Sequence, residues 1–270
     1  MQIKKAKTKS LLCAEETELF WEQGYLHIST IFDEEETREL SEEMDRLISA
    51  WAIRSKGWSG DWRGAYMDEE TEKRSELIAM HNLFYYSAAW ARAVMHPRLV
   101  AGMADLLGPD VELHHTTMHV KPPQTGQPFP MHQDHPFYAH EDERYIDVLV
   151  HLDDTFHENG EIRFLGGSHK TGPLEHIRQT AEGDPCSPHL PTDEYHLEDA
   201  VPVPAKAGDI VAFNINTIHG SYINKTDRDR RLVRIGYRHP DNVQIAGQGF
   251  GKPGWMVAGK RTRKPGQELF

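Results

Sequence analysis

The chain has 270 residues, of which 38% are hydrophobic and 27% charged, and its formal net charge at pH 7 is -12. This length and composition fit a single folded domain with enough apolar material for a core. The excess of acidic side chains gives no electrostatic support for a nucleic-acid partner or a membrane partner. We therefore expect a small molecule as the partner, and either a monomer or a homodimer.

The sequence also indicates a compartment. No stretch is long and apolar enough to act as a signal peptide or to cross a membrane. The two cysteines, Cys13 and Cys186, are too few for a disulfide framework in a chain of this length. These features predict a cytoplasmic protein with reduced thiols.

Helical patterns dominate residues 1–108, which we expect to form a mostly helical annex with a lid. Apolar residues recur at helical spacing over four segments, 14–22, 33–51, 87–95 and 97–107. Asp33 or Glu34 is suited to begin the second helix, and Gly108 is suited to end the fourth.

Between Trp51 and Arg74 the helical pattern breaks, and aromatic residues stand among glycines and basic residues. A long irregular segment rich in aromatics is uncommon unless it closes over something, so this segment is a candidate lid. Its tryptophans could equally anchor the segment on the core.

From residue 109 the sequence changes to short, often β-branched segments separated by Gly, Pro, Asn and Asp. The predicted strands are 111–121, 145–152, 161–165, 200–203, 209–214 and 231–237. Such a succession predicts an antiparallel sandwich or barrel over residues 109–240.

We expect the tail, residues 241–270, to be loosely held from Gly249 onward. Its glycine-rich segment 247–252 resembles a phosphate-binding loop but lacks the spacing and the strand-to-helix setting of one. We therefore assign that segment no role in phosphate binding.

A candidate metal site stands in the segment 131–135, where His132 and Asp134 are one residue apart. On an extended strand such a pair points to the same face, so both side chains can reach one ion. His219 follows a later strand, and Arg230 lies eleven residues beyond it. Two histidines and one carboxylate are the ligands of non-haem Fe(II) oxygenases, and an arginine can grip a dicarboxylate co-substrate with two hydrogen bonds.

Several blocks around these residues resemble one family. They are Lys121-Pro122-Pro123, His132-Gln133-Asp134, Glu158-Asn159-Gly160, Gly166-Gly167-Ser168-His169-Lys170, Gly208-Asp209, His219-Gly220-Ser221, and Asn224-Lys225-Thr226 with Arg230. Over residues 76–238, and more weakly over the N-terminal helices, the chain resembles the phytanoyl-CoA dioxygenase family of Fe(II)- and 2-oxoglutarate-dependent oxygenases. The resemblance implies a mainly β fold, with a double-stranded β-helix (jelly-roll, cupin-like) core flanked by N-terminal helices.

The resemblance also implies a site and its cofactors. Fe(II) would be bound by His132, Asp134 and His219, and O2 would react there. The co-substrate 2-oxoglutarate would be bound by Arg230 with help from the hydroxyl of Ser221.

Other residues near this site are open to more than one interpretation. Arg231 and Arg234 are neighbours of Arg230, but the spacing from His219 favours Arg230. Thr117 and His119 share a strand face and either line the co-substrate pocket or serve ordinary strand packing.

At two positions where the family contacts its co-substrate, this chain has a different type of residue. A tryptophan of the name-giving enzyme falls near Val150, and a lysine falls near Met80 or His81. The surroundings of the co-substrate therefore cannot be transferred from that enzyme.

The implied activity is hydroxylation of an aliphatic C–H bond of a small-molecule metabolite, with release of succinate and CO2. Relatives that halogenate have a small residue in place of the ligating carboxylate, so Asp134 favours hydroxylation. Two alternatives remain, a cupin-like metalloenzyme that does not use 2-oxoglutarate and a non-catalytic ligand-binding protein.

Contacts to the prime substrate are expected from the annex, the lid and the segment after Asp134. The candidate residues are Trp58, Trp62, Tyr66, His81, Asn82, His135 and Phe137. Arg54, Arg63 or Arg74 could hold an acidic group of that substrate.

Overall fold

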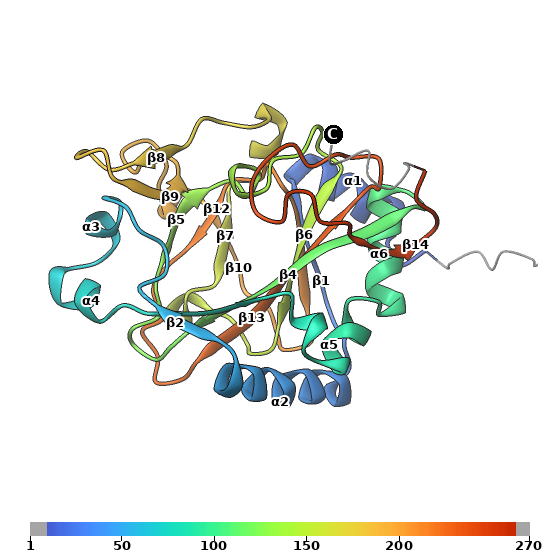
Figure 1. Cartoon of the computed structure of the whole chain (residues 1–270), viewed down its shortest axis with the longest axis horizontal. Helices are drawn as coiled ribbons and strands as arrows, with labels where there is room; N and C mark the ends of the chain where they lie inside the picture. Colours follow the sequence, from blue (N-terminus) through green and yellow to red (C-terminus); the bar gives the residue numbers. More distant parts are fainter. Residues whose placement is uncertain (1–9, 263–270) are drawn as a thin grey trace, which may run out of the picture.

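Two antiparallel sheets form the core of the computed structural model, which describes residues 10–262 (Figure 1). The eight-stranded sheet contains, in spatial order, β1 (Tyr25–Ile28), β11 (Ile210–Asn214), β6 (Tyr145–His151), β13 (Arg230–Arg238), β4 (Val111–Lys121), β3 (Leu77–His81) and β2 (Ile53–Ser55), with β14 (Trp255–Ala258) paired to β4. The four-stranded sheet contains β10 (Val201–Val203), β7 (Ile162–Phe164), β12 (His219–Ser221) and β5 (Phe129–His132). A separate hairpin joins β8 (Ile177–Gln179) to β9 (Pro185–His189).

The strands that follow one another along the chain are divided between the two sheets in the manner of a jelly roll. β4, β6, β11 and β13 belong to the larger sheet, and β5, β7, β10 and β12 belong to the smaller one. The facing surfaces pack together, and the rings of Phe164 on β7 and Phe213 on β11 have centroids 5.3 Å apart. The predicted mainly β core with flanking helices is confirmed.

Side chains alternate across β6 and so divide its residues between two environments. Ile146, Val148 and Val150 belong to the apolar cluster under the helices, whereas Leu149 belongs to the cluster between the sheets. With a period of two, Asp147 falls on the same inner face as Leu149. On β6 the inner face therefore contains a polar group, and the outer face is apolar.

Helices cover the outer face of the larger sheet. The α-helices are α1 (Ala14–Gln23), α2 (Glu34–Ala50), α3 (Arg63–Tyr66), α4 (Glu69–Arg74), α5 (Ala88–Ala93) and α6 (Pro97–Leu107). The 3-10 turns are η1 (Leu83–Tyr85), η2 (His135–Phe137), η3 (His157–Asn159), η4 (Ser168–Thr171) and η5 (Leu197–Asp199). Buried residues of α1, α2, α5 and α6 pack in one cluster with the outward side chains of the sheet.

Local sequence explains where these helices begin and end. Asp33 caps α2 by accepting from the backbone of Glu36, whose side chain accepts from the backbone N–H of Asp33 in return. Pro97 stands in the first turn of α6, and Gly108 with φ of 95° follows its last turn. Within residues 10–262, no helix is both long and apolar enough to cross a membrane.

The first 108 residues are less purely helical than the sequence predicts, because β1, β2 and β3 join the larger sheet. These strands have only four, three and five residues, and the three residues of β2 are all exposed. A pattern of period two is not readable over so few residues.

The tail also differs from the expectation of a loosely held segment, as far as residue 262. β14 pairs with the start of β4, and the guanidinium of Arg261 lies 2.6 Å from a carboxylate oxygen of the buried Glu112. These long-range partners were not apparent from the composition of the tail. Residues 263–270 lie outside the described part of the chain.

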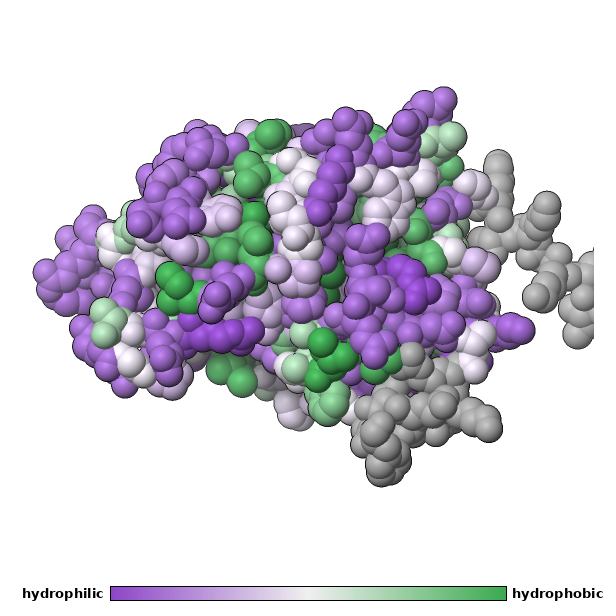
Figure 2. All heavy atoms as spheres, turned by 90° about the horizontal axis from the view of Figure 1, so that it is seen from above, coloured by the Kyte–Doolittle hydropathy of each residue, from purple (hydrophilic) through white to green (hydrophobic). Residues whose placement is uncertain are grey.

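The face seen from above the view of Figure 1 is mostly hydrophilic. Figure 2 shows that apolar residues on this face occur in small groups among hydrophilic ones. This distribution agrees with the strongly negative net charge of the chain.

Candidate metal centre

His132 and His219 lie opposite one another on adjacent strands of the smaller sheet. His132 ends β5, His219 begins β12, and the two are register partners. Asp134 lies just beyond β5 with helical backbone angles, φ of -78° and ψ of -22°. A turn therefore brings Asp134 toward His132, and not the strand alternation that the sequence reasoning assumed.

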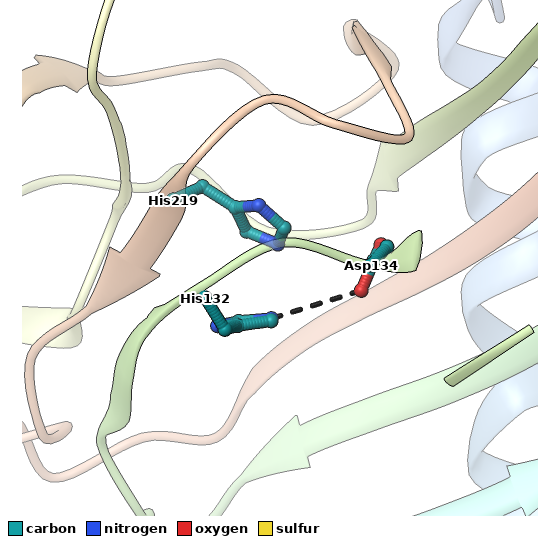
Figure 3. Close-up of side chains that lie close together, drawn as sticks. All are labelled: His132, Asp134 and His219. Carbon is teal, nitrogen blue, oxygen red and sulfur yellow. Dashed lines mark ion pairs between the residues drawn. The ribbon is translucent and has the colours of Figure 1, made fainter. Parts of the chain in front are cut away.

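The three side chains point toward one another, as Figure 3 shows. One ligand atom of each residue lies within 4.8 Å of those of the other two, and all three residues are buried. The His132 Nε2 atom is 3.7 Å from Asp134 Oδ1, and the two imidazole rings have centroids 4.2 Å apart. These separations are compatible with a single ion between them.

Hydrogen bonds to backbone carbonyls fix which nitrogen each histidine presents. His132 Nδ1 lies 2.7 Å from the carbonyl oxygen of Pro130, and His219 Nδ1 lies 2.9 Å from that of Thr217. A carbonyl only accepts, so in both rings Nδ1 carries the proton and Nε2 has a lone pair available. Such an outer hydrogen bond is the usual way of orienting a metal-binding histidine.

The charge states of these candidate ligands also favour metal binding. Burial lowers the pKa of His219 to about 3, and the adjacent His132 adds to this effect. Burial alone would raise the pKa of the Asp134 carboxyl, but Arg234, His132 and His219 outweigh it and hold that pKa well below its usual value. The site therefore offers a neutral imidazole and an ionised carboxylate.

A second buried carboxyl group belongs to the same cluster. Arg234 donates from Nη1 to Asp134 Oδ1 over 2.8 Å, and its Nε lies 3.7 Å from Asp147 Oδ1. Tyr138 donates its hydroxyl to Asp147 Oδ2 over 2.7 Å. Burial and the charge of Asp134 raise the pKa of Asp147 well above its usual value, so this carboxyl is held protonated beside its ionised neighbour.

Beside the histidines lies a small cavity between the sheets, the arginine cavity, lined by Arg230, His132, His219 and Trp58 among others. Its volume is about 30 Å³. Arg230 is 1% exposed, and none of its three guanidinium nitrogens has a hydrogen-bond partner among the described residues. Burial lowers the pKa of Arg230 to about 10, but the group is still charged at neutral pH.

The two neighbouring arginines are engaged elsewhere. Arg231 pairs with Asp153 at 2.7 Å and with Asp45 at 2.7 Å. Arg234 faces the same side as Arg230 but is bonded to Asp134. Among these three, Arg230 is the one whose charge has no partner.

The remaining predicted co-substrate residues are placed differently from one another. His119 lines the arginine cavity, whereas Thr117 bonds through its hydroxyl to His81 Nδ1 at 3.1 Å. Ser221 is fully buried, and its hydroxyl accepts a hydrogen bond of 2.7 Å from Lys121 Nζ. Burial lowers the pKa of Lys121 well below its usual value, and the nearby Arg230 lowers it further.

The sequence left open whether the tryptophans of the lid segment cover the site or anchor the segment on the core. The structure contains one tryptophan in each position. The ring of Trp58 lies over the site, with its centroid 4.7 Å from those of His132 and Phe137. Trp62 is instead an anchor, 2% exposed and packed with Met67 and Ile223.

Several other candidates line neither the arginine cavity nor the larger cavity to which His81 and Asn82 belong. Tyr66 packs beside Trp62, and His135 bonds to the carbonyl oxygen of His140. The three arginines suggested for an acidic substrate group form ion pairs with nearby acids, Arg54 with Glu76, Arg63 with Glu72 and Arg74 with Glu70. None of the three belongs to the lining of these cavities.

A larger cavity of about 350 Å³, the histidine cavity, lies on the other side of Arg234. His81 and Asn82 line it, together with His114, His115 and Tyr138. Gln248, Gly249 and Lys252 from the tail complete the wall. Arg234 connects this cavity to the metal site, because its Nη2 is 3.4 Å from His115 Nε2 and its guanidinium lies 5.1 Å from the ring centre of Tyr138.

Sequence reasoning missed several of these residues. Asp147 could have been found, because a carboxylate at an alternate position within the apolar run 145–152 must be buried and paired. The tail residues gave no comparable signal. Val150 and Met80, which stand near two family co-substrate positions, face the helix-side cluster and do not line the arginine cavity.

Comparison with known proteins adds independent evidence. A family model described as "Phytanoyl-CoA dioxygenase (PhyH)" matches residues 20–232. A probable alpha-ketoglutarate-dependent hypophosphite dioxygenase of Stutzerimonas stutzeri is 28% identical over 260 residues, covering 93% of this chain and 88% of that protein. An ectoine dioxygenase of Bordetella parapertussis is 26% identical, covering 88% of this chain and 79% of that protein.

The fold is likewise shared with solved structures. The crystal structure of EctD from S. alaskensis with 2-oxoglutarate and 5-hydroxyectoine superimposes with a TM-score of 0.68 at 22% identity, covering 97% of this chain and 88% of that one. This likeness supports the jelly-roll assignment.

Proposed function

Since the chain belongs to the phytanoyl-CoA dioxygenase family, we propose that His132, Asp134 and His219 bind Fe(II) and that Arg230 binds the distal carboxylate of 2-oxoglutarate. The activity is that of an Fe(II)- and 2-oxoglutarate-dependent dioxygenase acting on a small molecule. One observation carries the residue assignment. A buried, partnerless arginine lies in the same cavity as two histidines whose Nε2 atoms face a carboxylate.

The donor set fits Fe(II). Two imidazole nitrogens and one carboxylate leave open coordination positions, which a co-substrate and O2 require. Asp134 Oδ2 is buried without a hydrogen-bond partner among the described residues, so a cation would satisfy it. A structural zinc site would instead be closed by a fourth ligand, commonly a cysteine, and neither Cys13 nor Cys186 belongs to the cluster of His132, Asp134 and His219.

Arg230 fits a carboxylate for a complementary reason. A guanidinium buried without an anion is unfavourable, and a carboxylate can satisfy it with two parallel hydrogen bonds. Lys121 is the register partner of Arg230 on β4, and the Lys121 amine donates to the hydroxyl of Ser221. A cupin-like enzyme without 2-oxoglutarate would give this buried arginine no partner.

Fe(II) and 2-oxoglutarate, when bound, would supply the oxidising power to insert one oxygen atom of O2 into a C–H bond, with formation of succinate and CO2. The side chains position these groups and exclude water. Arg234 orients the Asp134 carboxylate, and the carbonyls of Pro130 and Thr217 orient the histidines. The retained carboxylate of Asp134 supports hydroxylation over halogenation.

Trp58 would control entry to the arginine cavity. The cavity volume of about 30 Å³ is close to that of one water molecule, so 2-oxoglutarate cannot enter unless side chains move. Trp58 belongs to the segment between β2 and α3 and packs on His132, Phe129 and Phe137. We assign it the role of a lid residue that shifts when co-substrate binds.

The prime substrate would occupy the histidine cavity. That cavity is about ten times larger than the arginine cavity, and its wall residues His115 and Tyr138 contact Arg234, which holds Asp134. A substrate there would be separated from Asp134 by the Arg234 side chain and would leave the coordination positions of the metal to 2-oxoglutarate and O2. The sequence candidates His81 and Asn82 line this cavity.

Titration with Co(II), monitored by its visible absorption, tests the ligand assignment without turnover. The wild type is expected to bind one equivalent, and His132→Ala, Asp134→Ala and His219→Ala are each expected to bind much more weakly. His196→Ala, a change at an exposed histidine, is the matched control and should bind as the wild type does. Stoichiometric binding by any of the three variants at low Co(II) would remove that residue from the site.

A further inference from the structure

The wall of the histidine cavity is unusual in its composition. Three of its side chains are imidazoles, those of His81, His114 and His115, and the others are Asn82, Tyr138, Gln248 and Lys252. Neither an aliphatic hydrocarbon side chain nor a carboxylate belongs to the lining. Such a surface offers several hydrogen-bonding groups, and its apolar area comes mainly from rings and not from aliphatic side chains.

The hydrogen bonds of the deep wall have one consistent arrangement. His114 Nε2 faces Gln244 Oε1 at 3.0 Å, and its Nδ1 lies 2.8 Å from the Tyr145 hydroxyl. An amide oxygen only accepts, so His114 carries its proton on Nε2 and accepts from Tyr145 on Nδ1. His115 receives the Arg234 N–H on Nε2 and faces the Tyr145 oxygen with Nδ1 at 3.0 Å. Both imidazoles are therefore neutral and already engaged.

The cations around the cavity outnumber the anions. Burial lowers the pKa of His114 to about 3, and the positive charges of Arg238, Arg234 and Lys252 contribute to that shift. Burial, Arg234 and Lys252 also lower the pKa of His81. The nearby acids are already matched, since Asp134 pairs with Arg234 and Glu112 pairs with Arg238 and Arg261. The cavity is thus a positive region in a chain whose net charge is -12.

The glycine-rich segment 247–252 supplies the outermost charge. Gly247, Gly249 and Gly251 all have positive φ, between 77° and 94°, a conformation that other residues adopt only with strain. Gly249 comes so near the cavity wall that an added Cβ would lie 3.4 Å from His114 Nε2. Lys252 follows at the rim, exposed, and pairs with no carboxylate among residues 10–262.

We propose that the histidine cavity binds a prime substrate bearing a small oxyanion, a carboxylate or a phosphonate, with Lys252 as its counter-charge at the rim and Asn82 as a hydrogen-bond donor. This inference rests on the proposed function, because it gives the chemical class of the substrate for the same site. It disfavours long acyl chains, since the lining lacks aliphatic side chains.

The test uses the full chain loaded with Ni(II) and saturated with 2-oxoglutarate, so that no turnover occurs. Methylphosphonate, propionate and the neutral propionamide are titrated separately by calorimetry. We expect one or both anions to bind saturably and propionamide not to bind. Which anion binds more tightly distinguishes a phosphonate from a carboxylate substrate.

Two substitutions and one control localise the binding. Lys252→Met should weaken anion binding by about fivefold, the effect of one rim charge. Aspartate has nearly the shape of asparagine and also tolerates the φ of 56° at position 82. Asn82→Asp therefore changes mainly the charge, and the added negative charge should weaken anion binding by roughly tenfold or more. Lys260→Met removes an exposed lysine from the same part of the tail, outside the cavity lining, and should change nothing.

The outcomes separate the two proposals. Failure of 2-oxoglutarate to bind would overturn the proposed function itself. Normal 2-oxoglutarate binding with no saturable anion binding, or with equal binding of propionamide, would overturn only the anion inference. Anion binding that is undiminished in both Lys252→Met and Asn82→Asp would also overturn it.

Discussion

Arg234 donates a hydrogen bond of 2.8 Å to Asp134, so the carboxylate that we propose as an iron ligand is also held by a buried guanidinium. The same arginine lies 3.7 Å from the protonated carboxyl of Asp147 and 3.4 Å from His115. It thus stands between the proposed metal site and the histidine cavity. Its charge offsets that of Asp134 and sets the orientation of that ligand.

Arg234→Met should strongly destabilise the metal-free protein. The substitution leaves the buried Asp134 carboxylate without its partner, a change that typically costs about 3–5 kcal/mol. Urea unfolding at pH 7 measures the effect. Arg228→Met removes an exposed arginine from the loop before β13 and should change stability by less than about 0.5 kcal/mol. Equal effects of the two substitutions would refute the role given to Arg234.

Arg230→Met should have the opposite effect on the protein without co-substrate. Burial lowers the pKa of Arg230 to about 10, which corresponds to a cost of about 3 kcal/mol for keeping the charge in the folded state. Because the folded pKa is below the unfolded one, this cost applies at every pH below about 10. The variant should therefore unfold at a higher urea concentration than the wild type. A clear loss of stability would mean that Arg230 has a structural partner.

Acid should destabilise the metal-free protein steeply. Burial lowers the pKa values of His114, His151 and His219 from 6.5 to about 3. Between these limits the unfolded state takes up protons that the folded state does not, so stability is lost as the pH falls from about 6.5 toward about 3. Each histidine contributes about 1.4 kcal/mol per pH unit, or about 4 kcal/mol for the three.

Urea unfolding at pH 7, 6 and 5 measures that slope. His151→Gln should reduce it by about 1.4 kcal/mol per pH unit, because this buried histidine is distant from the proposed ligands in sequence and titrates only on unfolding. His196→Gln, at an exposed position, should leave the slope unchanged. A stability that does not vary with pH over this range would contradict the buried, neutral state of these side chains.

Trp58 should report the binding of co-substrate. Addition of 2-oxoglutarate to the Ni(II)-loaded protein is expected to change the tryptophan fluorescence, because the ring on His132 must move to admit it. The change should be absent in Trp58→Phe and retained in Trp255→Phe, whose side chain is exposed and does not belong to the cavity lining. A fluorescence change that persists in Trp58→Phe would exclude this lid.

The sequence was informative where short-range patterns or motifs determine structure. The spacing of His132 and Asp134 made them a candidate pair, and the family resemblance implied His219 as the third ligand; these three side chains meet in the fold. Spacing from His219 also favoured Arg230 over Arg231. In the structure Arg230 lines the arginine cavity and Arg231 does not, because neighbouring residues of a strand face opposite sides of the sheet.

The sequence was less informative where long-range packing decides. Trp58 and Trp62 look alike in the sequence, but one lies on the metal site and the other in a small apolar cluster. Lys252 reaches the histidine cavity because the tail returns across β4, and no local pattern predicts that path.

The central claim is that Fe(II) and 2-oxoglutarate bind together between His132, Asp134, His219 and Arg230. Anaerobic titration of the Fe(II)-loaded protein with 2-oxoglutarate tests it through the weak visible charge-transfer band of the chelate. The wild type and Arg228→Met should develop the band at low 2-oxoglutarate, and Arg230→Met should require about tenfold to a hundredfold more. No band in the wild type, or an undiminished band in Arg230→Met at low 2-oxoglutarate, would contradict the account.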